Sequence, residues 1–444
     1  MRGLGWGLLL VLGSLAFAAP AARAQAQETG ETAVPEAERP AVVVTDAGGR
    51  RFQIAAQEFG GGGLDGAKLR QDVVDGLDFS GLFQAIDPAA FLGPRVTSAL
   101  SDALDCGSWR QIGADALLEG VARGGSIEVR AWDVARCRAV LSRSYRAGAD
   151  ARRTARRIAD DVVEAFTGKR GVASTEITFV STRGGNSEIY VMDADGGGQR
   201  AATRNKSINE FPSWSPDGNA IVYMSYFYRR SPKLFRIVRG GSQQPGRLLR
   251  NLDATRAVYR GVYAPSGGRL AAVISVDGAP EIFTVDADGK NLRRLTNHKA
   301  IDVSPTWSPD GSRIAFVSDR TGSPQVYVMN ADGSGQRRLT FEGSYNTAPD
   351  WSPDGRWIAY ETRVGGQHDI WLIDPEGKSN AALVTHPRTD ENPSWAPDSR
   401  KIAFHSTRRG KPDVYVVDLD GQNARRITSA AGENTHPCWG PYPR

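Results

Sequence analysis

The sequence contains few cysteines, and this limits the chemistry that it can support. Three cysteines occur in 444 residues, so disulfides cannot provide most of the stability of the chain. Cys106 and Cys137 lie in one non-repeating region, and the sequence leaves open whether they are bonded; Cys438 is expected to be a buried thiol. No C-x-x-C pair is present, which excludes the usual redox and zinc spacings.

The sequence also lacks a strong excess of charge of either sign. Its 55 Lys and Arg and 50 Asp and Glu give a formal net charge of +5. Removal of residues 1–24, which contain Arg2 and Arg23 but no acid, would leave +3. No basic stripe interleaved with aromatic residues is present, although such a stripe is the usual sign of a nucleic-acid surface. We therefore predict no nucleic-acid partner.

Long apolar stretches are absent after the amino terminus. Arg2 precedes an apolar run over residues 4–17, and Ala22-Arg23-Ala24 offers the small residues of an export-signal cleavage site. This run is short and interrupted by Gly, and no stretch of about 18 apolar residues follows it. We expect residues 1–24 to be a signal peptide cleaved near Ala24, and the mature protein to be exported and soluble, without direct membrane insertion.

Two short segments follow the expected signal. Residues 25–40 carry four Glu and two Pro, so we expect a flexible acidic tail. The β-branched run Val42-Val43-Val44-Thr45-Asp46 could pair as an added strand with the sheet edge of a partner, or it could be the first strand of the next domain. Both interpretations stay open.

Residues 41–168 contain no repeat and predict a small α/β domain. Helical spacing of apolar residues occurs over 67–77 and 151–166, and we expect Arg152, Arg153, Arg156 and Arg157 on the exposed face of the second helix. Strands are expected at residues 52–54, 82–86, 116–122, 127–134 and 140–145. The Gly60–Gly63 run is not a phosphate loop because Ala67 stands where a lysine is needed; we expect a flexible loop.

A repeat fills the rest of the chain. The pattern Trp307-Ser308-Pro309-Asp310-Gly311 recurs intact at Trp214 and Trp351, and in eroded form at Tyr263, Trp395 and Trp439. The steps between these aromatics are 49, 44, 44, 44 and 44 residues. Each period holds four strand signals, for example at 303–307, 313–317, 325–329 and 337–340, and four strands per period of this length indicate a β-propeller blade.

The two ends of the array predict how the ring closes. It begins at Ile177 with a second-strand sequence and ends at Trp439 with a first-strand sequence. One blade is therefore expected to combine strands from both ends. We predict an α+β amino-terminal domain followed, over residues 172–444, by an all-β six-bladed propeller closed by its carboxyl-terminal strand, and we expect a monomer.

This combination of an export signal, a small α/β domain and six Trp-Ser-Pro-Asp-Gly blades with one split blade resembles the TolB family of the Tol-Pal system, from about Val42 to the end. The resemblance implies a non-enzymatic periplasmic adaptor. It implies that the propeller binds the peptidoglycan-associated lipoprotein Pal and that an amino-terminal segment, here residues 42–46, engages the inner-membrane protein TolA. The assembly would maintain the outer membrane and help it constrict during division.

The sequence shows no set of residues typical of a catalytic site. It lacks a G-x-S-x-G elbow. His298 and His386 each lie nine residues before a repeat Trp, in equivalent loops that could face one another near the channel. A metal site wants three or four convergent ligands, so we predict no metal and no cofactor. A periplasmic propeller enzyme, such as a polysaccharide lyase or hydrolase using channel histidines and acids, and a generic sugar or peptide binder remain the alternatives.

The strongest candidate for partner binding is a polar column five residues before each repeat aromatic. We expect it to begin the innermost strands and to surround one mouth of the channel, although capping of the turns that enter each blade is a compatible role. With neighbouring loop residues it gives the predicted Pal-binding rim: Asn209, Glu210, Arg260, Asp302, Val303, Asn346, Thr347, Asp390, Glu391 and Asn434. Complementary charge and hydrogen bonds at this rim would govern the encounter with Pal and its register on the propeller.

Overall fold

The computed structural model describes residues 50–63, 65–92, 99–148, 150–228, 230–239, 246–249 and 256–443. The expected signal peptide, the acidic tail and the strand-forming segment at residues 42–46 lie outside these described residues. None of the described helices combines the length and the apolar character that a membrane span needs.

The amino-terminal domain is built on one mixed sheet. β1 pairs in parallel with β3 and β4, and β4, β5 and β6 then follow as antiparallel neighbours. The strands lie in the order β3 (Phe83–Ala85), β1 (Phe52–Ala56), β4 (Ala116–Arg123), β5 (Ser126–Asp133) and β6 (Arg138–Arg146). The expected mixed α/β arrangement is confirmed.

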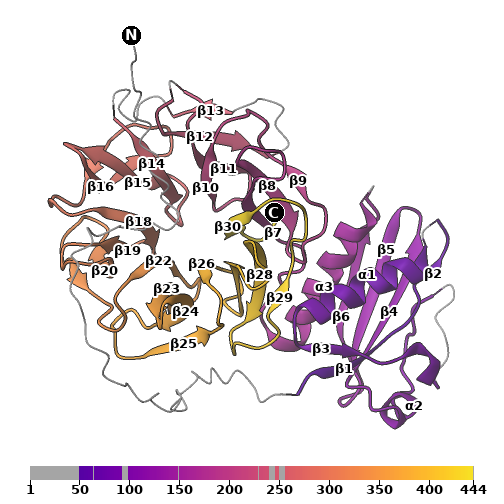
Figure 1. The fold of residues 1–444 in the computed structure, drawn as a ribbon. Coiled ribbons are helices and arrows are strands. Elements are labelled where there is room, and N and C mark those ends of the chain that lie inside the picture. The colour runs from indigo at the N-terminus through magenta and orange to yellow at the C-terminus, as the bar shows by residue number, and fades with distance from the viewer. Residues whose placement is uncertain are drawn as a thin grey trace. The chain divides into compact units, whose positions relative to one another are not determined.

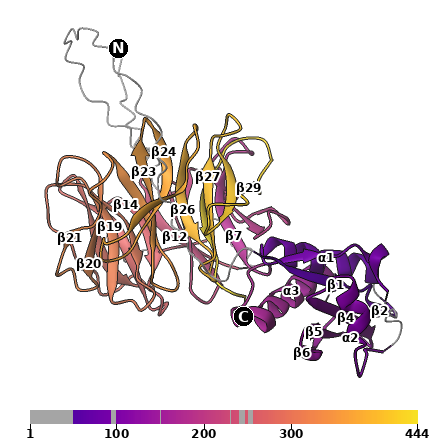
Figure 2. The same cartoon turned by 90° about the horizontal axis from the view of Figure 1, so that it is seen from below.

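Two helices cover one face of this sheet and lie side by side (Figure 2). They are α1 (Gly66–Phe79) and α3 (Ala151–Thr167), and the short α2 (Cys106–Gln111) and a 3-10 turn at Pro88–Ala90 were not predicted. Asp65 and Asp150 cap the starts of the two long helices by accepting backbone N–H hydrogen bonds. A disulfide joins Cys106 of α2 to Cys137, with Cα atoms 5.8 Å apart.

Two expectations for this domain were wrong. Gly60 and Gly61 form a short strand, β2 (Gly60–Gly61), that pairs with β4, rather than a flexible loop. Gly61 has φ +92, and a Cβ there would lie 2.1 Å from the carbonyl oxygen of Ala122, so a side chain cannot fit. Arg156 is only 5% exposed, because it pairs with two acids of the propeller.

The propeller consists of four-stranded antiparallel sheets arranged in a ring (Figure 1). The region around the axis of this ring, which the inner strands surround, is called the channel below. Its second and third strands are almost continuously apolar because neighbouring blades cover both of their faces. The described residues form the predicted six blades, each given from its inner to its outer strand. They are β10 (Asn209–Trp214), β11 (Ala220–Ser225), β12 (Lys233–Val238) and β13 (Arg247–Leu248); β14 (Val258–Tyr263), β15 (Arg269–Val276), β16 (Ala279–Asp286) and β17 (Arg293–Arg294); β18 (Asp302–Trp307), β19 (Arg313–Ser318), β20 (Gln325–Asn330) and β21 (Arg337–Arg338); β22 (Asn346–Trp351), β23 (Ile358–Val364), β24 (Gln367–Ile373) and β25 (Asn380–Val384); β26 (Asp390–Trp395), β27 (Lys401–Ser406), β28 (Asp413–Asp418) and β29 (Arg425–Arg426); and β30 (Asn434–Trp439), β7 (Glu176–Ser181), β8 (Glu188–Asp193) and β9 (Arg200–Ala201).

The last of these blades closes the ring. Its inner strand β30 comes from the carboxyl end and pairs with β7 from the start of the array, so that Trp439 opposes Ile177 and Asn434 opposes Ser181. This is the split blade that the sequence predicted. Pairing β30 with β7 gives this blade the same four-strand order as the other five.

The repeat motif ends each inner strand and makes the turn that follows it. The lead aromatics are buried, with exposed fractions of 4–7%. In Ser308-Pro309-Asp310-Gly311 the N–H of Gly311 donates to the carbonyl oxygen of Ser308 at 2.8 Å, and Gly311 has φ +71. Pro therefore supplies the fixed φ of the second position, and Gly tolerates the left-handed last position.

The amino-terminal domain contacts the propeller where inner strands end. Phe79 lies beside Trp439, with ring centroids 6.4 Å apart, and the guanidinium of Arg425 lies 4.3 Å from the Phe79 ring. Arg156 reaches Asp193 at 2.5 Å and Asp195 at 2.6 Å on the β8–β9 hairpin. A single apolar core joins α1 and α3 to β7, β28 and β30. The opposite end of the channel, where the inner strands begin, is called the entry rim below.

Candidate functional site in the propeller channel

The predicted polar column stands where the sequence placed it, at the first residue of each inner strand, but it is buried. Its five polar members are 0% exposed: Asn209, Asp302, Asn346, Asp390 and Asn434. The amide of each asparagine donates to the preceding blade, to Glu188, Gln325 and Asp413 respectively, at 2.8–3.0 Å. These residues fasten one blade to the next. Asn209 and Asn346 also donate to carbonyl oxygens of the loops before their own strands, at Ser207 and Glu342, which is the turn-capping role that the sequence left open.

The two aspartates of the column are held by arginines instead. Arg408 donates to both carboxylate oxygens of Asp390 at 2.8 and 3.0 Å, and its guanidinium lies over the rings of Phe404 and Tyr415. Arg320 donates to one oxygen of Asp302, Oδ2, at 2.9 Å, and its guanidinium lies over its own aromatic pair. A Ser-x-Arg pattern after the second strand marks both sites in the sequence.

The accessible part of the predicted rim is therefore smaller than expected. Glu210, Arg260, Val303 and Thr347 are half-buried, and Glu391 is 8% exposed. Arg260 lies over the ring of Phe211 at 5.8 Å. These five side chains belong to the second or third residue of an inner strand, so they lie just inside the entry rim. Partner binding by them stays a prediction.

A bulge in the inner strands shapes this part of the channel. The strand register shifts after the second residue in five of the blades, and the next residue has a positive φ. These residues are Phe211 (φ 52), Ser304 (φ 52), Ala348 (φ 48), Asn392 (φ 54) and His436 (φ 49). A bulge re-aims nearby side chains, and here it lies next to Glu210, Thr347 and Glu391.

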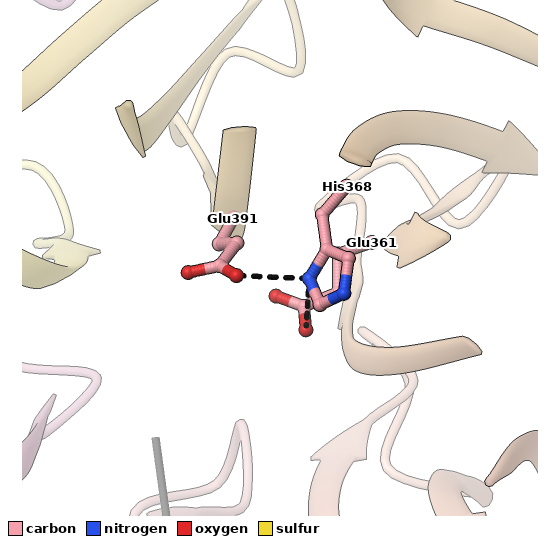
Figure 3. Close-up of side chains that lie close together, drawn as sticks. All are labelled: Glu361, His368 and Glu391. Atoms are coloured by element: carbon pink, nitrogen blue, oxygen red, sulfur yellow. Dashed lines mark ion pairs between the residues drawn. The ribbon is translucent and has the colours of Figure 1, made fainter. Parts of the chain in front are cut away.

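Three titratable side chains converge beside these bulges. Glu361 of β23, His368 of β24 and Glu391 of β26 each offer a ligand atom, and the three atoms lie within 4.8 Å of one another. Nδ1 of His368 is 2.8 Å from Oε1 of Glu391 and 3.7 Å from Oε1 of Glu361. Figure 3 shows both carboxylates turned toward this one imidazole nitrogen. The cluster spans two adjacent blades.

Surrounding groups hold the three side chains in place. The hydroxyl of Thr347 donates to Oε1 of Glu361, and the backbone N–H of Asn392 donates to Oε2 at 3.0 Å. Nε2 of His405 lies 2.9 Å from Oε2 of Glu391. The ring of His368 stacks on Tyr345, with centroids 5.6 Å apart. Glu361 is thereby held through both of its carboxylate oxygens, and Glu391 is held through the oxygen that does not face His368.

Burial and nearby groups shift the pKa values of the two carboxylates in opposite directions. Burial raises the pKa of Glu361, and the nearby charge of Glu391 raises it further. Burial also raises the pKa of Glu391, but hydrogen bonds with His368 and His405 outweigh it and hold that pKa well below its usual range. Burial lowers the pKa of His368, but its hydrogen bond with Glu391 and the charges of both glutamates outweigh burial and raise it.

Elsewhere the channel wall carries an imidazole packed on an aromatic ring, an acid and an arginine. The ring of His436 packs edge-on against Phe211, with centroids 4.8 Å apart, and lies 5.9 Å from the ring of His405. Burial raises the pKa of Asp350 to about 6, although the backbone N–H of Trp395 donates to this carboxylate and Arg260 is near. The channel wall thus carries a cluster of acids and imidazoles and, elsewhere, the cation of Arg260.

The two histidines that the repeat pattern singled out, His298 and His386, lie outside this cluster. Nδ1 of His298 and Nδ1 of His386 each accept the backbone N–H two residues further on, so both stabilise their own loops. His298 is exposed and His386 is half-buried, and neither belongs to the convergent cluster.

A sequence signal for the cluster did exist. In five blades, the second residue of the inner strand pairs with a residue of the second strand, and these paired residues occupy equivalent positions. They hold Val180, Met224 and Val317 in three blades, but Glu361 and His405 in two adjacent ones. Polar residues in a column that is otherwise apolar indicate a site.

Comparisons with known proteins cover both domains. The family model described as TolB beta propeller domain matches residues 163–443, and the one described as TolB amino-terminal domain matches residues 40–140. The chain is 38% identical over 278 residues to the Tol-Pal system protein TolB of Anaeromyxobacter dehalogenans strain 2CP-C, a stretch that covers 61% of this chain and 63% of that protein.

Two further similarities agree. The chain is 39% identical over 307 residues to the Tol-Pal system protein TolB of Anaeromyxobacter sp. strain K, covering 67% of each. The solved structure of TolB from Acinetobacter baumannii superposes with a TM-score of 0.75 at 23% identity, covering 89% of this chain and 98% of that one. This last likeness supports the fold.

Proposed function

Because this chain belongs to the TolB family, we propose that it is a non-enzymatic periplasmic adaptor of the Tol-Pal system. In this proposal the propeller binds the lipoprotein Pal, the amino-terminal segment binds TolA, and the complex serves outer-membrane integrity and cell division. The observation that carries the proposal is the pairing of both TolB domains in one chain whose relatives are named as Tol-Pal system proteins.

We place the Pal contact at the entry rim. The contacts with the amino-terminal domain described above involve Trp439 and the β8–β9 hairpin, at the end of the channel remote from this rim. The rim presents Glu210, Arg260, Val303 and Thr347 as half-buried side chains on a rigid ring. A mixture of one cation with acidic and hydroxyl groups favours a polar contact in which charge sets the orientation.

A charge reversal on one blade tests this placement. Calorimetry with purified Pal should show that Arg260→Glu weakens binding about 10-fold or more, because it reverses the cation at the rim. The control is Arg269→Glu, an exposed arginine where β15 of the same blade begins, at the other end of the channel. Equal affinities for the two variants would contradict a Pal site at the rim.

The TolA contact is proposed for residues 42–46, at the start of the amino-terminal domain. Deletion of these residues should abolish capture of purified TolA and leave Pal binding intact, since the segment would act as an added strand. A deletion variant that still captures TolA would place that contact elsewhere while leaving the Pal proposal untouched.

A second candidate, a periplasmic propeller enzyme acting on polysaccharide, is favoured by one observation, the convergence of Glu361, His368 and Glu391. Paired carboxylates with different proton affinities are typical of acid–base catalysis. Release of oligosaccharide from an acidic polysaccharide by the wild type, lost in Glu361→Gln, would favour the enzyme over the adaptor.

A further inference from the structure

The cluster of Glu361, His368 and Glu391 brings one imidazole nitrogen and two carboxylate oxygens from two blades together. Two carboxylate oxygens face the same nitrogen, Nδ1 of His368, at 2.8 and 3.7 Å. One N–H can donate along only one of these directions. The imidazole therefore serves the nearer oxygen, that of Glu391, while the oxygen of Glu361 accepts from Thr347 and lies too far away for a hydrogen bond with His368. A cation placed among the three atoms would contact all of them.

The donor set identifies the kind of cation. Imidazole nitrogen combined with carboxylate oxygen suits divalent transition metals such as zinc, whereas calcium and magnesium prefer oxygen alone. A four-coordinate ion with bonds of about 2.0–2.2 Å keeps its ligand atoms roughly 3.4 Å apart. The separations of 2.8 and 3.7 Å bracket this value. We propose that Glu361, His368 and Glu391 bind one divalent transition-metal ion of the zinc class.

The support around the three side chains matches that of a metal site. Thr347 and the backbone N–H of Asn392 fix Glu361, and His405 fixes Glu391 through the oxygen that does not face His368. Ligating carboxylates are ordinarily held by such outer partners. The donors are thereby oriented before any ion arrives, so little ordering entropy opposes binding.

A second observation comes from His405 itself. This side chain is 4% exposed, and its Nδ1 has no hydrogen-bond partner among the described residues. An imidazole nitrogen buried without a partner is costly, because it has lost its water and gained nothing in exchange. A polar ion site next to Glu391 would explain why a histidine occupies a position that is apolar in three other blades.

The position of the cluster predicts a structural effect. Glu361 and His368 lie on the β23–β24 hairpin, and Glu391 lies on the inner strand of the next blade. A bound ion would therefore bridge two blades that are otherwise joined by packing and hydrogen bonds. Binding to the folded state alone raises the unfolding temperature by mass action.

The test uses the purified chain stripped with chelator and then titrated with zinc chloride at pH 7.5. Calorimetry should show one equivalent of zinc bound, and the unfolding midpoint should rise with zinc concentration. Glu361→Gln and Glu391→Gln keep the side-chain shape but remove a charged ligand. Each should weaken zinc binding by more than about 100-fold, whereas loss of an outer partner costs about 10–100-fold. Calcium chloride should bind at least about 10-fold more weakly than zinc.

The control is His386→Ala, which removes a loop histidine outside the cluster and should keep the zinc affinity of the wild type. The proposal is overturned if the wild type binds no zinc, if both glutamine variants bind zinc as tightly as the wild type, or if calcium binds as tightly as zinc. Circular dichroism of each variant separates loss of zinc binding from loss of the fold. The zinc-dependent unfolding midpoint of the wild type tests the proposal without any variant.

Discussion

The indole Nε1 of Trp439 donates a hydrogen bond to Oγ1 of Thr175 at 2.8 Å, although the two residues lie 264 positions apart. Around this bond, β30 pairs with β7, and Ser181 donates to Oδ1 of Asn434 at 2.8 Å. Phe79 of α1 packs against the same tryptophan. The carboxyl end thus closes the ring and takes part in the contact with the amino-terminal domain.

Removal of β30 should therefore prevent stable folding. A chain that ends at Glu433 would expose β7 along its length and would lose the burial of Trp439, which alone is worth about 3–5 kcal/mol. Urea unfolding followed by circular dichroism should show no cooperative transition. Trp439→Phe keeps the apolar ring and should unfold cooperatively, with a loss of about 1 kcal/mol for the missing hydrogen bond. A compact truncated chain that still binds Pal would contradict the prediction.

Arg408 should contribute far more to stability than the arginine beside it. Arg408→Met would leave the 0% exposed Asp390 without its cation, and breaking a buried pair in this way costs about 3–5 kcal/mol. Arg409→Met changes an exposed side chain and should lie within about 0.5 kcal/mol of the wild type. Urea unfolding measures both. Equal effects would show that Asp390 is stabilised by other means.

The repeat, the split blade and the start of each inner strand could be predicted because they depend on local signals. The spacing of the Trp motif sets the period, and the strand types at the two ends of the array determine the closure. The burial of the column could not be predicted from single positions, since Asn and Asp at a strand start also suit an exposed turn. Its partners lie in the preceding blade, 21 residues earlier in each of the three asparagine pairs.

The channel cluster was harder to predict for a physical reason. Glu361, His368 and Glu391 come from three strands of two blades, and bulges near Thr347 and Glu391 determine where the side chains point. His298 and His386 stand out in the sequence instead, because they share a position in the repeat. The residues of the proposed metal site are those that break the repeat.

Arg156 should couple the amino-terminal domain to the propeller. It is 5% exposed and pairs with Asp193 and Asp195, whereas Arg157 on the same helix is exposed. Arg156→Met leaves both acids without this partner and should cost about 3–5 kcal/mol, although Asp195 keeps Arg152 at 3.1 Å. Arg157→Met is the matched control and should have little effect. If differential scanning calorimetry gives the same midpoint for both variants, these ion pairs do not secure the domain contact.

His436 should make stability depend on pH. Burial, with the nearby charges of His405 and Arg260, lowers the pKa of this imidazole to about 3, below its ordinary value of 6.5. Between these values the unfolded chain binds a proton that the folded chain does not bind. The contribution of the neutral imidazole is therefore fully present above pH 6.5 and is lost as the pH falls toward 3.

The glutamine variant isolates this contribution. His436→Gln cannot take up the proton in either state, so the wild type should lose about 1 kcal/mol of unfolding free energy relative to the variant between pH 7.5 and 5.5. This estimate is reduced because the side chain is half-buried rather than fully enclosed. Urea unfolding in chelator at both pH values measures the difference. His298→Gln alters an exposed loop imidazole and should run parallel to the wild type. A constant difference between wild type and His436→Gln would mean that the folded channel accepts the proton, and that His436 is hydrated rather than enclosed by Phe211 and its neighbours.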